Sequence, residues 1–366
     1  MVSTTISREW LAPVALDKRP RASYRQDLIN VWVGMWLTIG VFIDGWAHNT
    51  QGNTIESFFT PWHAIFYSGF LACAAWIGWL IGRQRARGRI GLGAVPLGYG
   101  LGALGIVVFG LGGIGDMTWH TVFGIETGLK ALLSPTHLML FLGAFLILTS
   151  PLRAAWTSDI VAPSLKAFLP PLLSMLAAAC FAYFMGMFFW STLDAWYADS
   201  ASDLVREFGL NGGRRVFEMH EVIGINNLLL TNALLLGPLF FLLSRWRLPF
   251  GTATILFGVS GLLMQAVDGI HQPEQILITF FVGLLTDGLV LALRAQPGRT
   301  IAFRVLGAAV PLVLWSLYFL AGQLRYGIEW PPEIWTGGIV LAMLSGVGLS
   351  LLAAPPPSRI DRPAAA

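Results

Sequence analysis

Long apolar segments separated by short polar ones dominate the hydrophobic pattern of this 366-residue chain. The apolar segments run for about 20 residues, the length at which a helix crosses the hydrocarbon core of a bilayer. Only helices suit such segments, because lipid offers backbone groups no hydrogen-bonding partners. The pattern predicts an all-α, polytopic transmembrane bundle of about ten helices, at 28–47, 63–82, 91–115, 136–152, 167–193, 220–243, 250–268, 275–293, 303–323 and 334–354.

The predicted helices pair into five out-and-back hairpins within one transmembrane domain, residues 28–354. A polar, basic arm (1–27) precedes this domain and is not expected to be a secretory signal. A short tail (355–366) follows it. Each hairpin is a predicted repeat unit, and the units lie at 28–82, 91–152, 167–243, 250–293 and 303–354.

Composition agrees with a membrane protein and excludes a soluble chain of this length. Hydrophobic residues make up 55% of the sequence and charged residues 12%, and a soluble surface needs far more charge. The mean hydropathy is +0.66. Cys73 and Cys180 lie inside apolar segments, so we expect two small buried thiols rather than a disulfide framework.

Lysine and arginine set the predicted orientation. Of the 23 basic residues, 18 lie on the side of the bundle that carries both termini. The positive-inside rule therefore predicts cytoplasmic termini and a multi-pass protein of the cell membrane. The basic pI reflects this topology and does not indicate nucleic-acid binding. The expected partner is the lipid bilayer, and membrane-protein partners or a homo-oligomer stay open.

The opposite, extracytoplasmic side, called the outer side below, carries the candidate chemistry. All six histidines and 14 of the 20 acidic residues fall there. Two turns repeat one pattern, Asp-x3-His, then Glu, then Ser/Thr-Pro-x-His. The first turn supplies Asp44, His48, Glu56 and His63, and the second supplies Asp116, His120, Glu126 and His137. We interpret these two turns as an internal duplication.

Two later turns keep parts of this pattern. The third contains Asp194 and His220 but has alanine where the middle histidine would stand. The fourth, "DGIHQPEQ", is a compressed version with Asp268, His271 and Glu274. The fifth turn keeps acids but has no histidine.

The Pro-x-His motif has a local physical reason. Thr60 and Ser134 are good N-cap residues, and the proline that follows each suits the first helical position. His63 and His137 then take the third position, where the helix dipole disfavours a charged imidazolium. A neutral imidazole at this place is a ready metal ligand or proton acceptor.

Imidazoles and carboxylates in this pattern are suitable ligands for copper, zinc or iron. Asp and His at i and i+4 share one helix face. We therefore predict a transition-metal site, copper or zinc, on the outer side. The predicted ligands are Asp44, His48, His63, Asp116, His120, His137, His220, Asp268 and His271. Glu56 and Glu126 are predicted as general bases or further ligands.

The motif is locally similar to one copper site in a membrane subunit of the particulate methane and ammonia monooxygenases. That site also reads Asp-x3-His with a later histidine near the next helix, which corresponds here to Asp44, His48 and His63, or to their counterparts in the second turn. The resemblance covers about 20 residues per copy. The gap before the last histidine is longer here, and the motif occurs twice. The resemblance implies metal chemistry at these residues, and it does not assign a family to the whole chain.

Two other functions stay open. In a transporter, the outer cluster would be an entry site for a metal ion or a proton-coupled substrate, and Asp287, deep in an apolar helix, would be a relay. In a non-catalytic scaffold, the Asp–His pairs would only tie hairpins together. The sparse charge at membrane depth favours the metalloprotein, as an enzyme that uses redox or hydrolytic chemistry.

Overall fold

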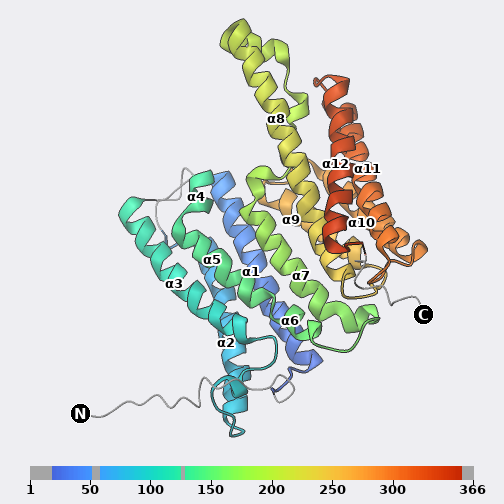
Figure 1. Cartoon of the computed structure of the whole chain (residues 1–366). Coiled ribbons are helices and arrows are strands. Elements are labelled where there is room, and N and C mark those ends of the chain that lie inside the picture. The colour runs from blue at the N-terminus through green and yellow to red at the C-terminus, as the bar shows by residue number, and fades with distance from the viewer. Residues whose placement is uncertain (1–18, 52–57, 125–127, 357–366) are drawn as a thin grey trace, which may run out of the picture. The chain divides into compact units, whose positions relative to one another are not determined.

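The computed structural model describes residues 19–51, 58–124 and 128–356 of the chain (Figure 1). All regular structure in these ranges is helical, which confirms the predicted all-α class. Within the described residues, eight helices are long and apolar enough to cross a membrane. The bent pair α5 (Pro135–Leu148) and α6 (Ser150–Trp156) would add a ninth. These helices indicate an integral, multi-pass membrane protein.

The chain divides into two compact units, which are described separately. The first comprises the described residues up to Asp159, with Lys166–Met185. Its further helices are α1 (Tyr24–Gln51), α2 (Pro61–Arg85), the 3-10 helix η4 (Gly91–Ala94), α3 (Gly100–Phe123), α4 (Leu129–Leu133) and nearly all of α7 (Leu165–Met185). The second unit contains η5 (Met187–Phe189), η6 (Trp196–Ala198), α8 (Ala201–Leu243), α9 (Thr252–Val267), α10 (Pro273–Ala292), α11 (Thr300–Arg325) and α12 (Pro332–Ala353).

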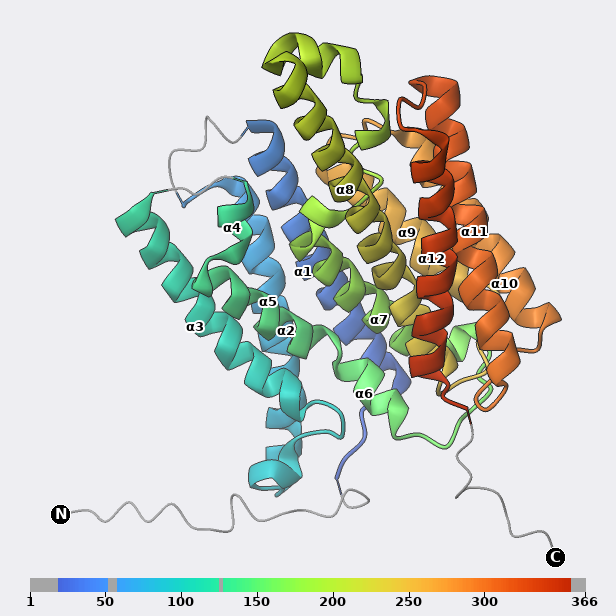
Figure 2. The same ribbon diagram turned by 45° about the horizontal axis from the view of Figure 1, so that its top comes forward.

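In the first unit α1 packs along α2, and α3 packs along α5 (Figure 2). Both pairs approach closely at a glycine. A Cβ atom at Gly40 would lie 2.8 Å from the Cα atom of Phe66, and one at Gly143 would lie 2.6 Å from the backbone nitrogen of Phe109. Small residues allow transmembrane helices this approach. Each pair thus brings the end of one helix beside the start of the other.

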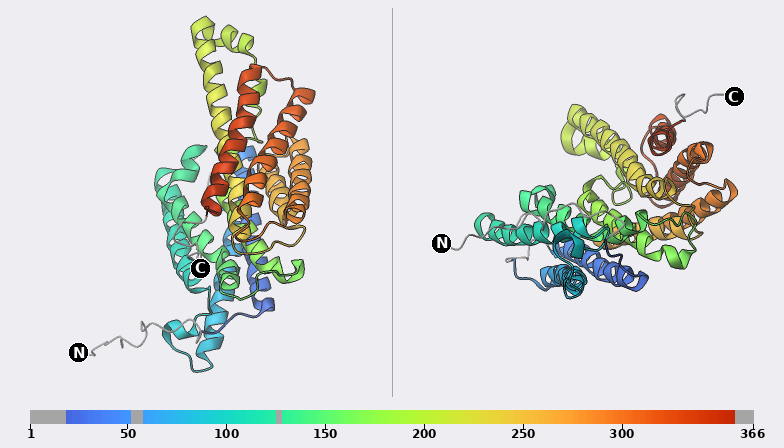
Figure 3. Two further views of the ribbon diagram at one scale, coloured as in Figure 1. Left: turned by 45° about the vertical axis from the view of Figure 1, so that its right-hand side comes forward. Right: turned by 60° about the horizontal axis from the view of Figure 1, so that its bottom comes forward.

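In the second unit α9 packs along α10, and α11 packs along α12 (Figure 3). The long helix α8 is interrupted at Gly209, whose φ of 74° is not helical. Asn232 of α8 donates its side-chain amide to the carbonyl of Ala342 in α12, at 3.1 Å. This polar residue inside an apolar helix therefore joins two helices, as polar groups in membranes commonly do.

Two predicted helices in the first unit differ from the structure. The segment 136–152 bends by 41° between α5 and α6, because Pro151 has no N–H to continue the helical bonding. The segment 91–115 becomes one long helix only from Gly100 onward. Gly98, just before it, has a φ of 89°, which a continuous helix cannot contain.

Two further differences involve the second unit. The segment 167–193 is helical only to Met185. Beyond it, the N–H of Ser191 donates to the hydroxyl of Thr231, and the Ser191 carbonyl accepts from the hydroxyl of Tyr318. These hydrogen bonds to side chains take the place of the backbone hydrogen bonds that would continue the helix. The segment 250–268 forms α9, which is shorter than the candidate spans. Each of the ten predicted segments contains a helix, and eight of these helices, or nine with the bent pair, are candidate spans among the described residues. The count of ten spans, the hairpin order, the single domain and the cytoplasmic termini stay predictions.

Candidate metal centre

The predicted helix starts are confirmed and place two histidines. The Thr60 hydroxyl accepts a hydrogen bond from the backbone N–H of His63 at 3.1 Å, and Pro61 begins α2. Ser134 caps α5 in the same way, accepting from the N–H of His137 at 3.3 Å. Local sequence alone explains this geometry, because an N-cap oxygen satisfies one of the free N–H groups of the first turn.

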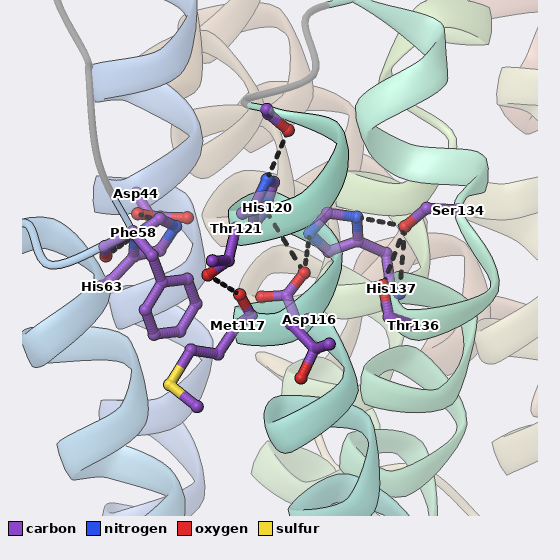
Figure 4. A network of polar contacts seen from close by, with 12 residues as sticks. Asp44, Phe58, His63, Asp116, Met117, His120, Thr121, Ser134, Thr136 and His137 are labelled. Carbon is purple, nitrogen blue, oxygen red and sulfur yellow. Dashed lines mark hydrogen bonds and ion pairs between the residues drawn. The ribbon is translucent and has the colours of Figure 1, made fainter.

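Asp116 contacts three side chains from three helices, and two of them, His120 and His137, are labelled beside it in Figure 4. Its Oδ1 lies 3.3 Å from Nε2 of His120, one turn further along α3, and 3.0 Å from Nε2 of His137 on α5. Its Oδ2 accepts a hydrogen bond of 2.8 Å from the hydroxyl of Tyr67 on α2. Asp116 is 1% exposed. We call Asp116, His120 and His137 the second group.

Asp44, His48 and His63 form the corresponding first group. Oδ1 of Asp44 lies 3.6 Å from Nε2 of His63, and Oδ2 lies 4.0 Å from Nε2 of His48. The Asp44 side chain is 14% exposed, against 2% for Asp116. In the first group the imidazoles therefore lie farther from the aspartate, and the aspartate is more exposed to solvent, than in the second group. The residues of both groups nevertheless follow the same pattern in the sequence.

The two groups adjoin and form one row of imidazole rings. Ring centroids are 5.6 Å apart for His48 and His63, 6.3 Å for His63 and His120, and 5.5 Å for His120 and His137. The sequence predicted that these two turns contribute to one region, without predicting how they meet. The structure brings them together as two groups of three side by side.

The Nδ1 contacts of His63 and His120 determine which nitrogen of each ring carries the hydrogen. Nδ1 of His63 lies 2.6 Å from the carbonyl oxygen of Phe58, and Nδ1 of His120 lies 3.3 Å from that of Gly124. A carbonyl oxygen only accepts, so both Nδ1 atoms must donate. In a neutral imidazole the remaining Nε2 is then a lone pair, and in both residues it faces an aspartate oxygen. A metal ion between the two atoms, or a proton on either the ring or the carboxyl group, makes this arrangement favourable.

The capacity of each group to hold a metal ion also depends on its aspartate oxygens. Oδ1 of Asp44 and Oδ1 of Asp116 are both buried, and neither accepts an aligned hydrogen bond. In each group, one ligand atom per residue lies within 4.8 Å of the others, so each group could hold a metal ion. Histidine that binds a metal typically donates its other N–H to a carbonyl or carboxylate. The residues present therefore fit a transition metal ion.

Other predicted ligands belong to the second unit. Nδ1 of His220 lies 2.8 Å from Oδ2 of Asp199, an acid that the sequence pattern did not single out. Asp268 directly follows the last residue of α9 and is its C-cap. Burial raises the pKa of Asp194, with the charges of Asp268 and Asp199 adding to it; burial also raises the pKa of Asp268, against the effect of His271. Metal binding by His220, Asp268 and His271 stays a prediction.

Glu56 and Glu126 lie outside the described residues. Glu274 forms an ion pair with Arg325 in the second unit.

Asp287 has a local structural role. Its Oδ1 accepts from the N–H of Ala253 at 2.9 Å, and its Oδ2 accepts from both the N–H and the hydroxyl of Thr254, at 3.0 and 2.7 Å. Both residues lie in the first turn of α9, so the carboxylate caps that helix from α10. An N-terminal helix end favours negative charge, which accounts for a buried carboxylate here without a transported ion.

Sequence reasoning missed Tyr67 and the carbonyls of Phe58 and Gly124. Tyr67 stands four residues after His63, on the same face of α2, and this i, i+4 spacing is the signal that could have identified it. Backbone carbonyls leave no signal in a sequence.

Comparison with known proteins gave no match: no family model, curated protein or solved structure is significantly similar to this chain.

Proposed function

We propose that this chain is a membrane metalloenzyme in which each of the two groups holds one transition metal ion, copper or zinc, on the extracytoplasmic side. The observation that carries the proposal is the direction of the imidazoles. His63 and His120 donate their Nδ1 hydrogens to backbone carbonyls, and their Nε2 atoms face buried aspartate oxygens. A metal ion accepts all of these donor atoms at once.

The donor set supports a catalytic rather than a structural ion. Two imidazoles and one carboxylate leave coordination positions open, whereas structural zinc sites are closed by four protein ligands. When bound, copper would supply electron transfer and zinc an activated water. The chain's own residues would hold the rings: the Phe58 and Gly124 carbonyls orient His63 and His120, and Tyr67 orients Asp116.

Glu56 and Glu126 keep their proposed role as general bases, since each follows an Asp-x3-His pair in the sequence. The transporter is the weaker alternative. Its proposed relay, Asp287, uses both carboxylate oxygens to cap α9. A relay would have to break these bonds.

The test is the metal content of detergent-purified protein, measured by mass spectrometry in the wild type and in His63→Ala, His137→Ala and the double variant. We expect one ion per group, the loss of one in each single variant and of both in the double. His220→Ala is the matched comparison. Because His220 pairs with Asp199 in the second unit, both ions of the two groups should stay, and the loss of a further ion would show that His220 is a ligand as well.

Protein that folds but stays metal-free on titration with copper, zinc and iron would overturn the proposal. The groups would then be ion pairs of protonated histidine with aspartate, which is the scaffold function. Nitrogen chemical shifts of the imidazoles distinguish the two, because a protonated ring has hydrogen on both nitrogens.

A further inference from the structure

A cavity of about 680 Å³ lies between α2 and α3, directly beside the first group. His63 and Phe58 line one end of it, and Tyr67 lines the wall. Phe70 and Phe109 line its other end, with their rings stacked at 4.3 Å. The volume is in the range of cavities that bind small molecules.

The side chains that line the cavity present almost only carbon atoms to a ligand. Three side chains that line the cavity carry nitrogen or oxygen atoms, Thr60, His63 and Tyr67, and all three already have polar partners. Nδ1 of His63 contacts the carbonyl oxygen of Phe58, and its Nε2 faces Asp44. The Thr60 oxygen accepts from the His63 backbone, and the Tyr67 hydroxyl donates to Asp116. A polar molecule buried in this cavity would lose its hydrogen bonds with water and recover few of them. The cavity therefore fits an apolar body with a single polar end near His63.

The direction of the cavity follows from the two helices. His63 and Leu71 are eight residues apart on α2, which corresponds to about 12 Å along a helix axis. Leu71 and Ile114, which lie on the rim, are 63% and 64% exposed. Both belong to helices that can span a membrane, so their exposed side chains would face hydrocarbon. Access to the cavity is from the lipid side.

We propose that this cavity binds a single-chain, lipid-soluble amphiphile, such as a medium-chain alcohol, with its polar head at His63 and its chain toward Phe70 and Phe109. The proposal rests on the proposed function in one respect: the head would lie beside the metal of the first group and is the part on which that metal would act. Binding of the chain depends on the apolar walls alone.

Gly110 gives a selective way to fill the cavity. It lines the wall on α3, and a Cβ there would meet the ring of Phe70 at 3.8 Å, an ordinary contact. In Gly110→Leu, the leucine carbons beyond Cβ would therefore fill the cavity without moving the backbone. Gly78→Leu on α2 is the matched control, because no atom lies within 4 Å of its Cβ position.

The experiment is photolabelling in nanodiscs with decanol that carries a diazirine at either end of its chain. Labelled peptides are mapped by mass spectrometry, with plain decanol as the competitor. We expect saturable labelling, near His63 and Met117 from the head-end probe and near Phe70 and Phe109 from the tail-end probe. Labelling should persist in Gly78→Leu and fall to uncompeted background in Gly110→Leu.

Labelling that rises linearly with probe, resists decanol and is equal in all three proteins would overturn the proposal. It would mean that the probe only partitions into lipid, or that a phospholipid chain fills the cavity. The metal content of the same wild-type nanodiscs, measured beside the labelling, separates the two proposals. Saturable labelling without bound metal would refute only the metalloprotein, and bound metal without saturable labelling would refute only the amphiphile.

Discussion

The two His/Asp groups are built from the same residues in the same order, yet the structure makes them unequal. In the second group the aspartate oxygen lies 3.0 and 3.3 Å from its two imidazoles, and in the first the distances are 3.6 and 4.0 Å. Two ligands that share one ion at metal–ligand distances of about 2.1 Å lie roughly 3 Å or slightly more apart. The second group is closer to that arrangement.

The difference arises from the neighbours and not from the motif. Asp116 on α3 is held from the other side by Tyr67, which belongs to α2. The second group therefore uses a residue of the first helix pair. A carboxylate that is oriented by a hydrogen bond binds a metal more tightly than a free one. Burial adds to this, because Asp116 is removed from competing water. We therefore expect tighter metal binding in the second group, and four predictions test this ranking.

The largest effect is expected from Asp116→Asn. The change removes the carboxylate that His120, His137 and Tyr67 share, and the loss of a buried charge partner is strongly unfavourable for the groups left behind. Metal affinity of the second group should fall by more than about 100-fold. Calorimetric titration with copper and zinc measures this affinity. Two ions bound with wild-type affinity would contradict the ranking of the two groups.

Asp44→Asn should have a smaller effect. Its carboxylate is partly exposed and stands further from its imidazoles. We expect a loss of about 10- to 100-fold in the first group, with the second unchanged. The same titration applies. A larger loss than that of Asp116→Asn would reverse the ranking.

Tyr67→Phe tests the neighbour directly. The change removes one hydroxyl that donates to Asp116 and keeps the ring. The second group should weaken by about tenfold, whereas the first should not respond. Chelator competition resolves the two ions. Tyr24→Phe is the control, because the Tyr24 hydroxyl donates to the carbonyl of Lys166. Equal affinities in Tyr67→Phe and wild type would show that burial alone separates the groups.

The smallest effects are expected at the two helix caps. Thr60→Ala and Ser134→Ala should each lower the unfolding free energy by about 1 kcal/mol, because each removes an N-cap. Ser134 also lies 2.6 Å from Nδ1 of His137, so only Ser134→Ala should weaken metal binding as well. Thermal unfolding in detergent and metal titration measure the two quantities. Ser134→Thr keeps the hydroxyl and should restore both.

Local signals were the part of the fold that the sequence predicted well. The starts of α2 and α5 were predicted from Thr60-Pro61 and Ser134-Pro135, because a cap and its proline act within one turn. Breaks were predicted poorly. The bend before Pro151 and the helix end at Met185 fall inside apolar segments, where hydropathy does not distinguish a helix from a loop that other helices support.

The same division holds for the candidate site. The Asp-x3-His spacing placed Asp44 with His48, and Asp116 with His120, because i and i+4 share one helix face. It did not predict that His63 would lie beside His120, or that Tyr67 would hold Asp116. Those contacts join helices that are distant in the chain, and no local pattern encodes them. The duplication of the two turns stays a prediction.

By itself the sequence determined that this protein is a bundle of membrane helices with imidazoles and carboxylates at particular helix ends. Hydrophobic length and cap chemistry are properties of single segments, so no neighbouring helix is needed to establish them. Only the tertiary structure decided that the two groups adjoin, that one is tighter than the other, and that an apolar cavity opens beside His63. These properties depend on how closely helices approach, which is set by packing at residues such as Gly40 and Gly143.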